Sequence, residues 1–273
     1  MASEEEEAEL EASKAPLLEH LVELRNRIIY SMIAFLICFL FCFFFAQQIY
    51  GFLTQPLADA LAGQPGRKMI FTALYETFFT YVKVGMFGAI CIAFPFMAAQ
   101  LWLFIAPGLY RNERKAFLPF LLATPVMFLI GASFVYYVML PYAIRFFVGF
   151  ETPGGEGTLP IELQARVSEY LGFVMTLIFA FGFCFELPVL LTLLGRVGIV
   201  TSAGLAGARR YAIVGVFAVA AVVTPPDVFS QLALAVPMVG LYEISVICVK
   251  LIERSRAKAD AAAASENRNI QPT

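Results

Sequence analysis

The sequence predicts an all-α, polytopic membrane protein with six transmembrane helices and both termini in the cytoplasm. Two observations define this fold class: 60% of the 273 residues are hydrophobic, and the mean hydropathy is +0.78. Only 15% of the residues are charged, whereas a soluble domain has about 25% charged and about 45–50% apolar residues. A soluble chain could not bury this much apolar surface, so the lipid bilayer is the expected solvent.

Runs of about 20 apolar residues are long enough to cross a hydrocarbon core about 30 Å thick. The predicted spans are approximately residues 28–47, 80–104, 117–140, 171–194, 211–223 and 228–249. The fifth span is short, and residues 224–227 (TPPD) leave almost no loop before the sixth. Because two prolines bar helix continuation, we expect a turn there, with one broken, re-entrant element as the alternative.

The distribution of basic residues predicts the orientation of the chain. With the N-terminus inside, 14 of the 19 Lys and Arg lie in inside segments, four lie in outside segments, and Lys83 lies within a span. Cytoplasmic segments of membrane proteins carry an excess of Lys and Arg. Both termini are therefore predicted to be cytoplasmic.

The chain divides into three predicted regions. Residues 1–15 form an acidic tail that we expect to be disordered, residues 16–250 a single six-helix transmembrane domain, and residues 251–273 a cytoplasmic C-terminal tail. Leucines at helical spacing from Leu17 onward predict a short amphipathic helix that leads into the first span. Prolines in the spans favour kinked helices, which fit either a concave bundle or ordinary membrane helices.

Several function classes are not expected. The sequence contains no nucleotide-binding or hydrolase motif, a single histidine (His20), and five cysteines that all lie in apolar runs. We therefore expect no enzyme activity, metal or cofactor, and we interpret the cysteines as small apolar packing residues. The pI near 5.6 argues against nucleic-acid binding.

The carboxylates are the most informative polar groups. Glu23 and Glu113 lie in segments predicted to be cytoplasmic, and each could simply pair locally, as Glu23 could with Arg27 at i,i+4. Alternatively, the two carboxylates bind a cationic ligand, for which a guanidinium is well suited. Glu186 lies inside a span at a cost of roughly 2.5–3.5 kcal/mol. It is either a hydrogen-bonded core residue beside a kink at Pro188 or part of a proton or substrate path.

Four motifs in order resemble the TatC family, the core membrane subunit of the twin-arginine protein translocase. They are residues 20–25 (HLVELR), 101–110 (LWLFIAPGLY) followed by Glu113 and Arg114, 181–188 (FGFCFELP), and 222–231 (VVTPPDVFSQ). The resemblance covers residues 16–250. It implies a concave, cupped arrangement of six helices in the bacterial cytoplasmic (inner) membrane, with both termini in the cytoplasm.

The resemblance also implies roles for individual residues. The residues implied in binding the twin-arginine signal peptide are Glu23, Arg25, Phe104 and Glu113. The resemblance implies that Glu186, a polar residue inside the membrane, takes part in the later steps of transport. Thr224 and Gln231 are implied in docking of the single-span TatA-like and TatB-like partners, and Pro56 and Asp227 in assembly at the outer face.

The expected function is that of a receptor and core component of the twin-arginine export system. The protein would bind twin-arginine signal peptides of folded precursors at its cytoplasmic face and nucleate assembly of the translocation site, with transport driven by the proton-motive force. Self-association, contact with the lipid bilayer and an absence of nucleic-acid partners are expected. The alternative is a proton-coupled secondary transporter that uses Glu186.

Overall fold

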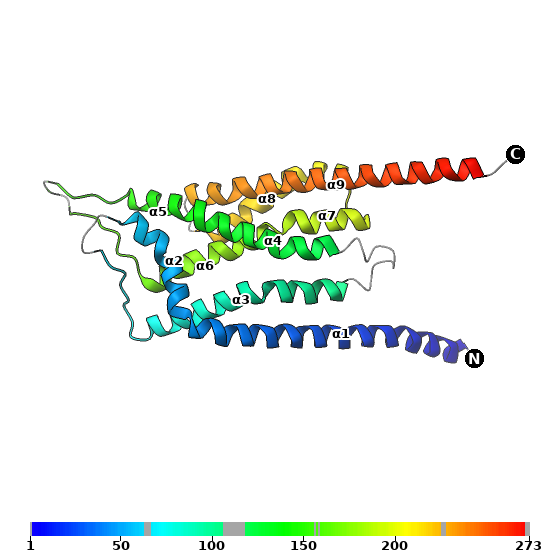
Figure 1. Ribbon diagram of the computed structural model, residues 1–273, viewed down its shortest axis with the longest axis horizontal. Helices are drawn as coiled ribbons and strands as arrows, with labels where there is room; N and C mark the ends of the chain where they lie inside the picture. The colour runs from blue at the N-terminus through cyan, green and yellow to red at the C-terminus, as the bar shows by residue number, and fades with distance from the viewer. Residues whose placement is uncertain are drawn as a thin grey trace. The chain divides into compact units, whose positions relative to one another are not determined.

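The structure, a computed structural model, describes the backbone of residues 2–62, 67–105, 118–155, 157, 159–224 and 228–270. Side chains of residues 2–19, 105, 118, 229, 259, 260 and 262–270 lie outside the description. The helices are α1 (Ala2–Phe44), α2 (Ala46–Ala60), α3 (Glu76–Ile105), α4 (Leu118–Phe134), the π-helical turn η3 (Val135–Met139), α5 (Leu140–Val148), α6 (Val167–Cys184), α7 (Leu187–Val197), α8 (Ser202–Val223) and α9 (Val228–Ile270) (Figure 1). Within the described ranges there is no sheet, only two isolated β-bridges in the loops.

The prediction of six transmembrane helices is confirmed. Six stretches of helix are long and apolar enough to cross a membrane: His20–Phe44, Glu76–Phe104, Pro119–Val148, Val167–Val197, Ser202–Val223 and Ser230–Lys258. Between the fifth and sixth, α8 and α9 are separate helices, as the predicted turn requires. The orientation of the termini and the concave arrangement stay predictions.

Three predicted boundaries were wrong. The fifth span begins at Ser202 rather than near residue 211, because the Thr201 hydroxyl accepts a hydrogen bond from the Gly204 amide (3.1 Å) and caps the helix there. The third span continues through η3 and α5 to Val148. The first helix ends at Phe44, and the sequence analysis missed the separate helix α2 that follows it.

The predicted acidic tail lies within a helix in the structure. We expected residues 1–15 to be disordered, whereas the backbone of α1 is helical from Ala2. The predicted amphipathic segment before the first span is part of the same continuous helix. The division into an N-terminal tail, a membrane domain and a C-terminal tail stays a prediction.

The chain forms two compact units, residues 1–50 with 81–121 and residues 51–80 with 122–273. In the first unit, α1 and α3 lie side by side and antiparallel (Figure 1). Gly85 allows the close approach, because a Cβ there would lie 3.2 Å from the Phe43 Cα. At the other end of the pair, His20 of α1 contacts Phe104 of α3. A small residue at a helix crossing is typical of membrane proteins.

In the second unit, α4 packs tightly against α6. Gly131 of α4 faces the backbone carbonyl of Phe181, and Gly182 of α6 faces the ring of Phe128. Phe128 and Phe181 are almost fully buried. Each glycine thus admits a large group from the partner helix, which brings the two backbones close together.

The fourth span is broken at Phe185 and Glu186, between α6 and α7. Pro188 lies in the first turn of α7, where a proline fits because the amide that it lacks would have no helical partner. The kink that Pro188 predicted is therefore confirmed. Pro95, Pro125 and Pro237, in contrast, lie inside helices that continue past them.

In the second unit, α9 packs against both α7 and α8. α7 ends at Gly198, whose φ of +84° is a left-handed conformation that closes the helix. α8 and α9 run antiparallel, since the Tyr242 hydroxyl donates to the Leu205 carbonyl (2.7 Å) and the Gln231 amide donates to the Phe217 carbonyl (3.4 Å). Gly195 of α7 faces the side chain of buried Val249 on α9.

Gly131→Ala is expected to destabilise the protein by about 1–3 kcal/mol, the usual range for overpacking. The new Cβ would lie 2.7 Å from the Phe181 carbonyl oxygen, a backbone atom that cannot rotate away. Gly215→Ala on α8 is the matched control, since a Cβ there meets nothing within 4 Å. It should be neutral or stabilising by up to about 1 kcal/mol, because Ala is the better helix former. Thermal unfolding in detergent measures both, and equal stability of the two variants would contradict the proposed close approach.

Candidate functional site

The first unit carries a polar and aromatic cluster where α1 meets the end of α3. The His20 ring stacks on the Phe104 ring, with centroids 4.2 Å apart and planes 13° from parallel. His20 is exposed and Phe104 is half-buried. His20 therefore has a packing role, against a residue that the resemblance implies in signal-peptide binding.

Glu23 lies one turn further along α1. Its carboxylate accepts a hydrogen bond from Arg27 (3.1 Å), the i,i+4 pair that the spacing predicted. Arg27 also donates to the side-chain oxygen of Gln100 on α3 (3.0 Å). Glu23 retains about a third of its side-chain exposure. The result is a carboxylate at the surface whose partner cation is anchored to a second helix.

Two other residues, Arg25 and Glu113, were assigned to the same site. Arg25 is exposed, and its guanidinium donates to the side chain of Asn26 (3.4 Å). Glu113 lies outside the described residues. Neither observation tests a role in binding, so both assignments stay predictions.

Glu186 is the residue before the first turn of α7 in the second unit. Its described polar neighbours are the hydroxyl of Thr124 and the backbone of Phe128, both on α4. Its Oε1 atom is buried without a hydrogen-bond partner within the described part of the chain. The break between α6 and α7 thus presents a carboxylate inside the fourth span with one oxygen available to bind a proton or a donor.

The residues expected to dock partners lie at one end of the α8–α9 hairpin. Thr224 is buried and its hydroxyl donates to the Ala220 carbonyl (2.8 Å), which completes the end of α8. Gln231 is half-buried and ties α9 to α8. Pro56 is buried in α2, whereas Asp227 lies outside the described residues.

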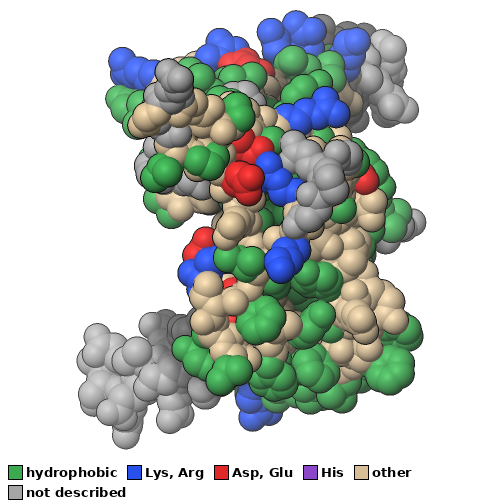
Figure 2. Space-filling view, turned by 90° about the vertical axis from the view of Figure 1, so that its left-hand side faces the viewer, with side chains coloured by type: hydrophobic (Ala, Val, Ile, Leu, Met, Phe, Trp, Pro, Cys, Tyr) green, Lys and Arg blue, Asp and Glu red, His purple; other side chains and the backbone are tan. Residues whose placement is uncertain are grey.

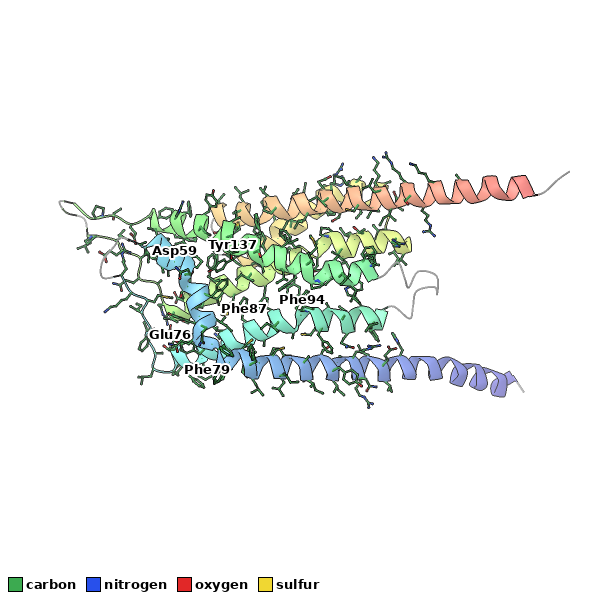
Figure 3. All side chains as sticks on the ribbon, in the orientation of Figure 1. Asp59, Glu76, Phe79, Phe87, Phe94 and Tyr137 are labelled. Atoms are coloured by element: carbon green, nitrogen blue, oxygen red, sulfur yellow. The ribbon has the colours of Figure 1, made fainter. Side chains whose placement is uncertain are left out.

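Glu76 is a carboxylate that joins two loops and that was not among the predicted site residues. Glu76, at the start of α3, accepts hydrogen bonds from the Thr72 amide (2.8 Å) and the Ser168 hydroxyl (2.6 Å), and Arg166 lies 3.4 Å away (Figure 3). The side chain is almost completely buried. Only the position of Glu76 at the start of an apolar run could have indicated this cluster, because Arg166 and Ser168 are 90 and 92 residues away in the sequence.

A second ion pair closes the same loops. The Arg67 guanidinium binds both carboxylate oxygens of Glu151, with 2.7 Å between Nη2 and Oε2, and the Leu163 amide donates to the same carboxylate (2.9 Å). The bond from Arg67, and then that from Leu163, hold the pKa of Glu151 below its usual range. Figure 2, which faces this end of the molecule, shows acidic and basic side chains adjoining one another.

Within the described residues, no group of three or more His, Cys, Asp or Glu side chains could hold a metal ion. The five cysteines are all free thiols, and Cys184 of α6 contacts the Met238 sulfur of α9 at 3.6 Å. Among the carboxylates assigned to functional sites, Glu23 and Glu186 are the two whose side chains the structure describes. A carboxylate can bind a cationic ligand and compensate its charge, or it can take up and release a proton.

Six apolar helices long enough to cross a membrane define a multi-pass membrane protein of the all-α class. Residues 19–237 match the family described as "TatC: Sec-independent protein translocase protein (TatC)". The chain belongs to this family, which is that of a protein translocase component.

Similar sequences and similar solved structures belong to the same family. The chain is 47% identical over 249 residues to the TatC of Magnetococcus marinus, which covers 91% of this chain and 89% of that protein. It is 40% identical over 261 residues to the TatC of Desulforapulum autotrophicum, covering 96% and 93%. A crystal structure titled as the twin-arginine translocase receptor TatC superposes with a TM-score of 0.74 at 37% identity, covering 86% of this chain and 99% of that one.

Glu151→Gln is expected to lower stability at neutral pH. Because the folded pKa of Glu151 is depressed, its ion pair stabilises the fold above the unfolded-state pKa, and this contribution is lost as the pH falls through the folded pKa. The difference in unfolding temperature between wild type and variant should therefore be largest near pH 7 and shrink below pH about 4, near the ordinary carboxylate range. A difference that stays constant down to strongly acidic pH would contradict the assignment to this ion pair.

Proposed function

We propose that this protein is the signal-recognition receptor and core component of a twin-arginine protein export system. It binds twin-arginine signal peptides of folded precursors and nucleates assembly of the translocation site. The observation that carries the proposal is the Glu23–Arg27–Gln100 contact, which presents an exposed carboxylate already bound to a guanidinium. Membership of a translocase family and likeness to a structure titled as a receptor support it.

Recognition is an exchange of cations at Glu23. The carboxylate is held 3.1 Å from Arg27 by a bond that an incoming guanidinium can replace with the same geometry. Arg27 does not lose all its partners in this exchange, because Gln100 still accepts from it. A lysine ammonium would gain less, since it lacks the planar fork that binds a carboxylate through two donors.

The aromatic stack beside this carboxylate gives the site a second surface. His20 and Phe104 form a flat face between α1 and the C-terminal end of α3. Arginine stacks readily on aromatic faces. Phe104 thereby contributes to the site through its ring, and Glu113 and Arg25 are proposed as its remaining members.

Glu186 serves a later step than recognition. Its partly unsatisfied carboxylate lies within the fourth span at the α6–α7 break, where it meets the apolar part of an inserted signal peptide or a partner helix. Thr224 and Gln231 dock TatA-like and TatB-like single-span subunits, and Pro56 and Asp227 support assembly at the outer face. The proton-motive force drives passage, and the protein itself makes and breaks no covalent bond.

The proposed location is the bacterial cytoplasmic membrane, with both termini in the cytoplasm. The excess of Lys and Arg in the segments assigned to the inside supports this orientation. It places the Glu23 cluster on the cytoplasmic side, where precursors are made. The Arg67–Glu151 pair and the Glu76 cluster then lie on the opposite side.

Glu23→Gln is expected to weaken binding of a twin-arginine peptide about two- to fivefold. The incoming guanidinium replaces Arg27 at a partly exposed ion pair, and such a pair contributes at most about 1 kcal/mol, where 1.4 kcal/mol is a factor of ten. Fluorescence titration of the peptide against the full-length protein in lipid nanodiscs measures the change. A lysine-lysine peptide should bind poorly to both proteins, and Glu113→Gln should weaken binding in the same way.

Glu169→Gln is the matched control, because Glu169 also forms a local pair, with Arg166 at i,i+3 (2.7 Å), but in the other unit. It should leave peptide binding unchanged. Unchanged binding in both Glu23→Gln and Glu113→Gln would refute the recognition site.

Glu186→Ala is expected to leave the initial binding of the signal peptide within about twofold of wild type and to impair export. The reason is position: Glu186 lies inside a span in the second unit, whereas the recognition residues belong to the first. Peptide titration in nanodiscs and export of a folded reporter in cells are the two measurements. If peptide binding is lost while the protein remains folded, Glu186 belongs to recognition and the proposed order of steps is wrong.

A further inference from the structure

The second unit contains a groove to which the proposed function assigns no ligand, although Pro56, proposed above for assembly, is one of its lining residues. It is a cavity of about 510 Å³ between α2 and the η3–α5 segment. Phe52, Gln55 and Asp59 line it from α2, and Tyr136, Tyr137 and Arg145 line it from η3 and α5. Figure 3 shows Asp59 and Tyr137 at the same end of the molecule. We call this cavity the interfacial groove.

Helical spacing produces the two walls. Phe52, Gln55 and Asp59 lie at i, i+3 and i+7, which is one face of α2. The opposite wall is formed by residues at intervals of about one turn, Tyr137 and Arg145 among them. A π-helical turn often marks a functional position in a helix, and here it brings adjacent tyrosines to the groove.

The walls are aromatic and polar at once. The rings of Phe52 and Tyr136 stack with centroids 4.3 Å apart and planes 3° from parallel. The Tyr136 hydroxyl donates to the Phe52 carbonyl (2.8 Å), so the stack is fixed in place. Tyr137 is 70% exposed. A rigid wall next to an open tyrosine face can receive a cation or an apolar chain.

The two charges of the groove lack charged partners. Asp59 accepts from Gln55 (2.8 Å), and no described cation pairs with it. Arg145 is exposed, and no described carboxylate lies within ion-pair distance of it. Arg67 and Arg166, the other arginines described near this end, both have carboxylate partners. The groove therefore offers one anion and one cation to a ligand.

The position of the groove relative to the bilayer defines the ligand further. The third span, Pro119–Val148, contains 30 residues, which extend about 45 Å at 1.5 Å per residue. A bilayer measures about 40–45 Å including its headgroup layers. The last turns of this span, with Arg145, thus lie at headgroup depth, where tyrosines are enriched.

We infer that the interfacial groove binds the headgroup of a zwitterionic phospholipid with a primary ammonium group. Arg145 binds the phosphate, and Asp59 and the open face of Tyr137 receive the ammonium. Only a molecule with both charges neutralises both side chains, and only a lipid is abundant at that depth. The inference is independent of the proposed function.

The test is native mass spectrometry of the full-length protein titrated with phosphatidylethanolamine or phosphatidylglycerol. Wild type should retain one phosphatidylethanolamine. Arg145→Gln should weaken retention of both lipids roughly three- to tenfold, because the phosphate contact is common to both. Asp59→Asn should weaken phosphatidylethanolamine by a similar factor and leave phosphatidylglycerol unchanged, since the latter carries no ammonium.

Lys68→Gln and Glu162→Gln are the matched controls, because both side chains are exposed in the loops of the same unit and neither lines the groove. They should retain both lipids as wild type does. Equal retention by wild type, Asp59→Asn and Arg145→Gln would overturn the inference, and so would equal losses in the controls. Unfolding temperatures verify that each variant is folded.

A second measurement identifies the occupant directly. A photoreactive phenylalanine analogue in place of Tyr137 should crosslink to phosphatidylethanolamine in membranes. Crosslinking to a protein partner instead would assign the groove to that partner and refute the lipid site.

Discussion

The absence of water from the bilayer interior is the constraint on which the rest of this structure depends. Backbone groups there must bond within the chain, so each described span is helical. Charged side chains must likewise find partners, as Glu23 does with Arg27, Glu76 with Arg166, and Arg209 with Glu243. Charges that break this pattern require another explanation. Among the described residues, the buried Oε1 atom of Glu186 has no hydrogen-bond partner and Arg145 has no carboxylate partner, so both are candidates for contact with other molecules.

The same constraint determines how the helices pack. Lipid tails are as apolar as leucine, so helix association depends on close contact rather than on removal of apolar surface from water. Gly131, Gly182 and Gly195 each admit a group of the neighbouring helix where a Cβ would clash. Because Gly131 and Gly182 hold α4 against α6, they also hold Thr124 of α4 near the Glu186 carboxylate at the end of α6. Packing and the chemistry of Glu186 therefore depend on the same helix pair.

Local features of the sequence predicted local features of the structure. Apolar length predicted six spans, Pro188 predicted the break in the fourth, and i,i+4 spacing predicted the Glu23–Arg27 pair. Contacts between residues distant in the sequence were not predictable. Nothing near Arg27 indicates Gln100, and nothing near Glu76 indicates Ser168.

The start of α8 was misplaced because Arg209 and Arg210 resemble a loop, whereas Arg209 lies in the helix and pairs with Glu243. Helix α2 was missed because the polar residues among its apolar ones weaken the hydropathy signal.

In the proposed recognition step, the pairing of Glu23 limits what this one residue can contribute. An incoming guanidinium replaces an existing guanidinium, so the net free energy is the difference between two similar bonds. An exposed pair of this kind contributes about 0–1 kcal/mol. Such an exchange discriminates arginine from lysine by geometry more than it provides affinity. The affinity must then come from a second carboxylate, from stacking on the Phe104 face and from burial of the apolar part of the peptide. A receptor built in this way requires two arginines and an apolar segment together, because no single contact at the site is strong enough to retain a peptide that lacks the others.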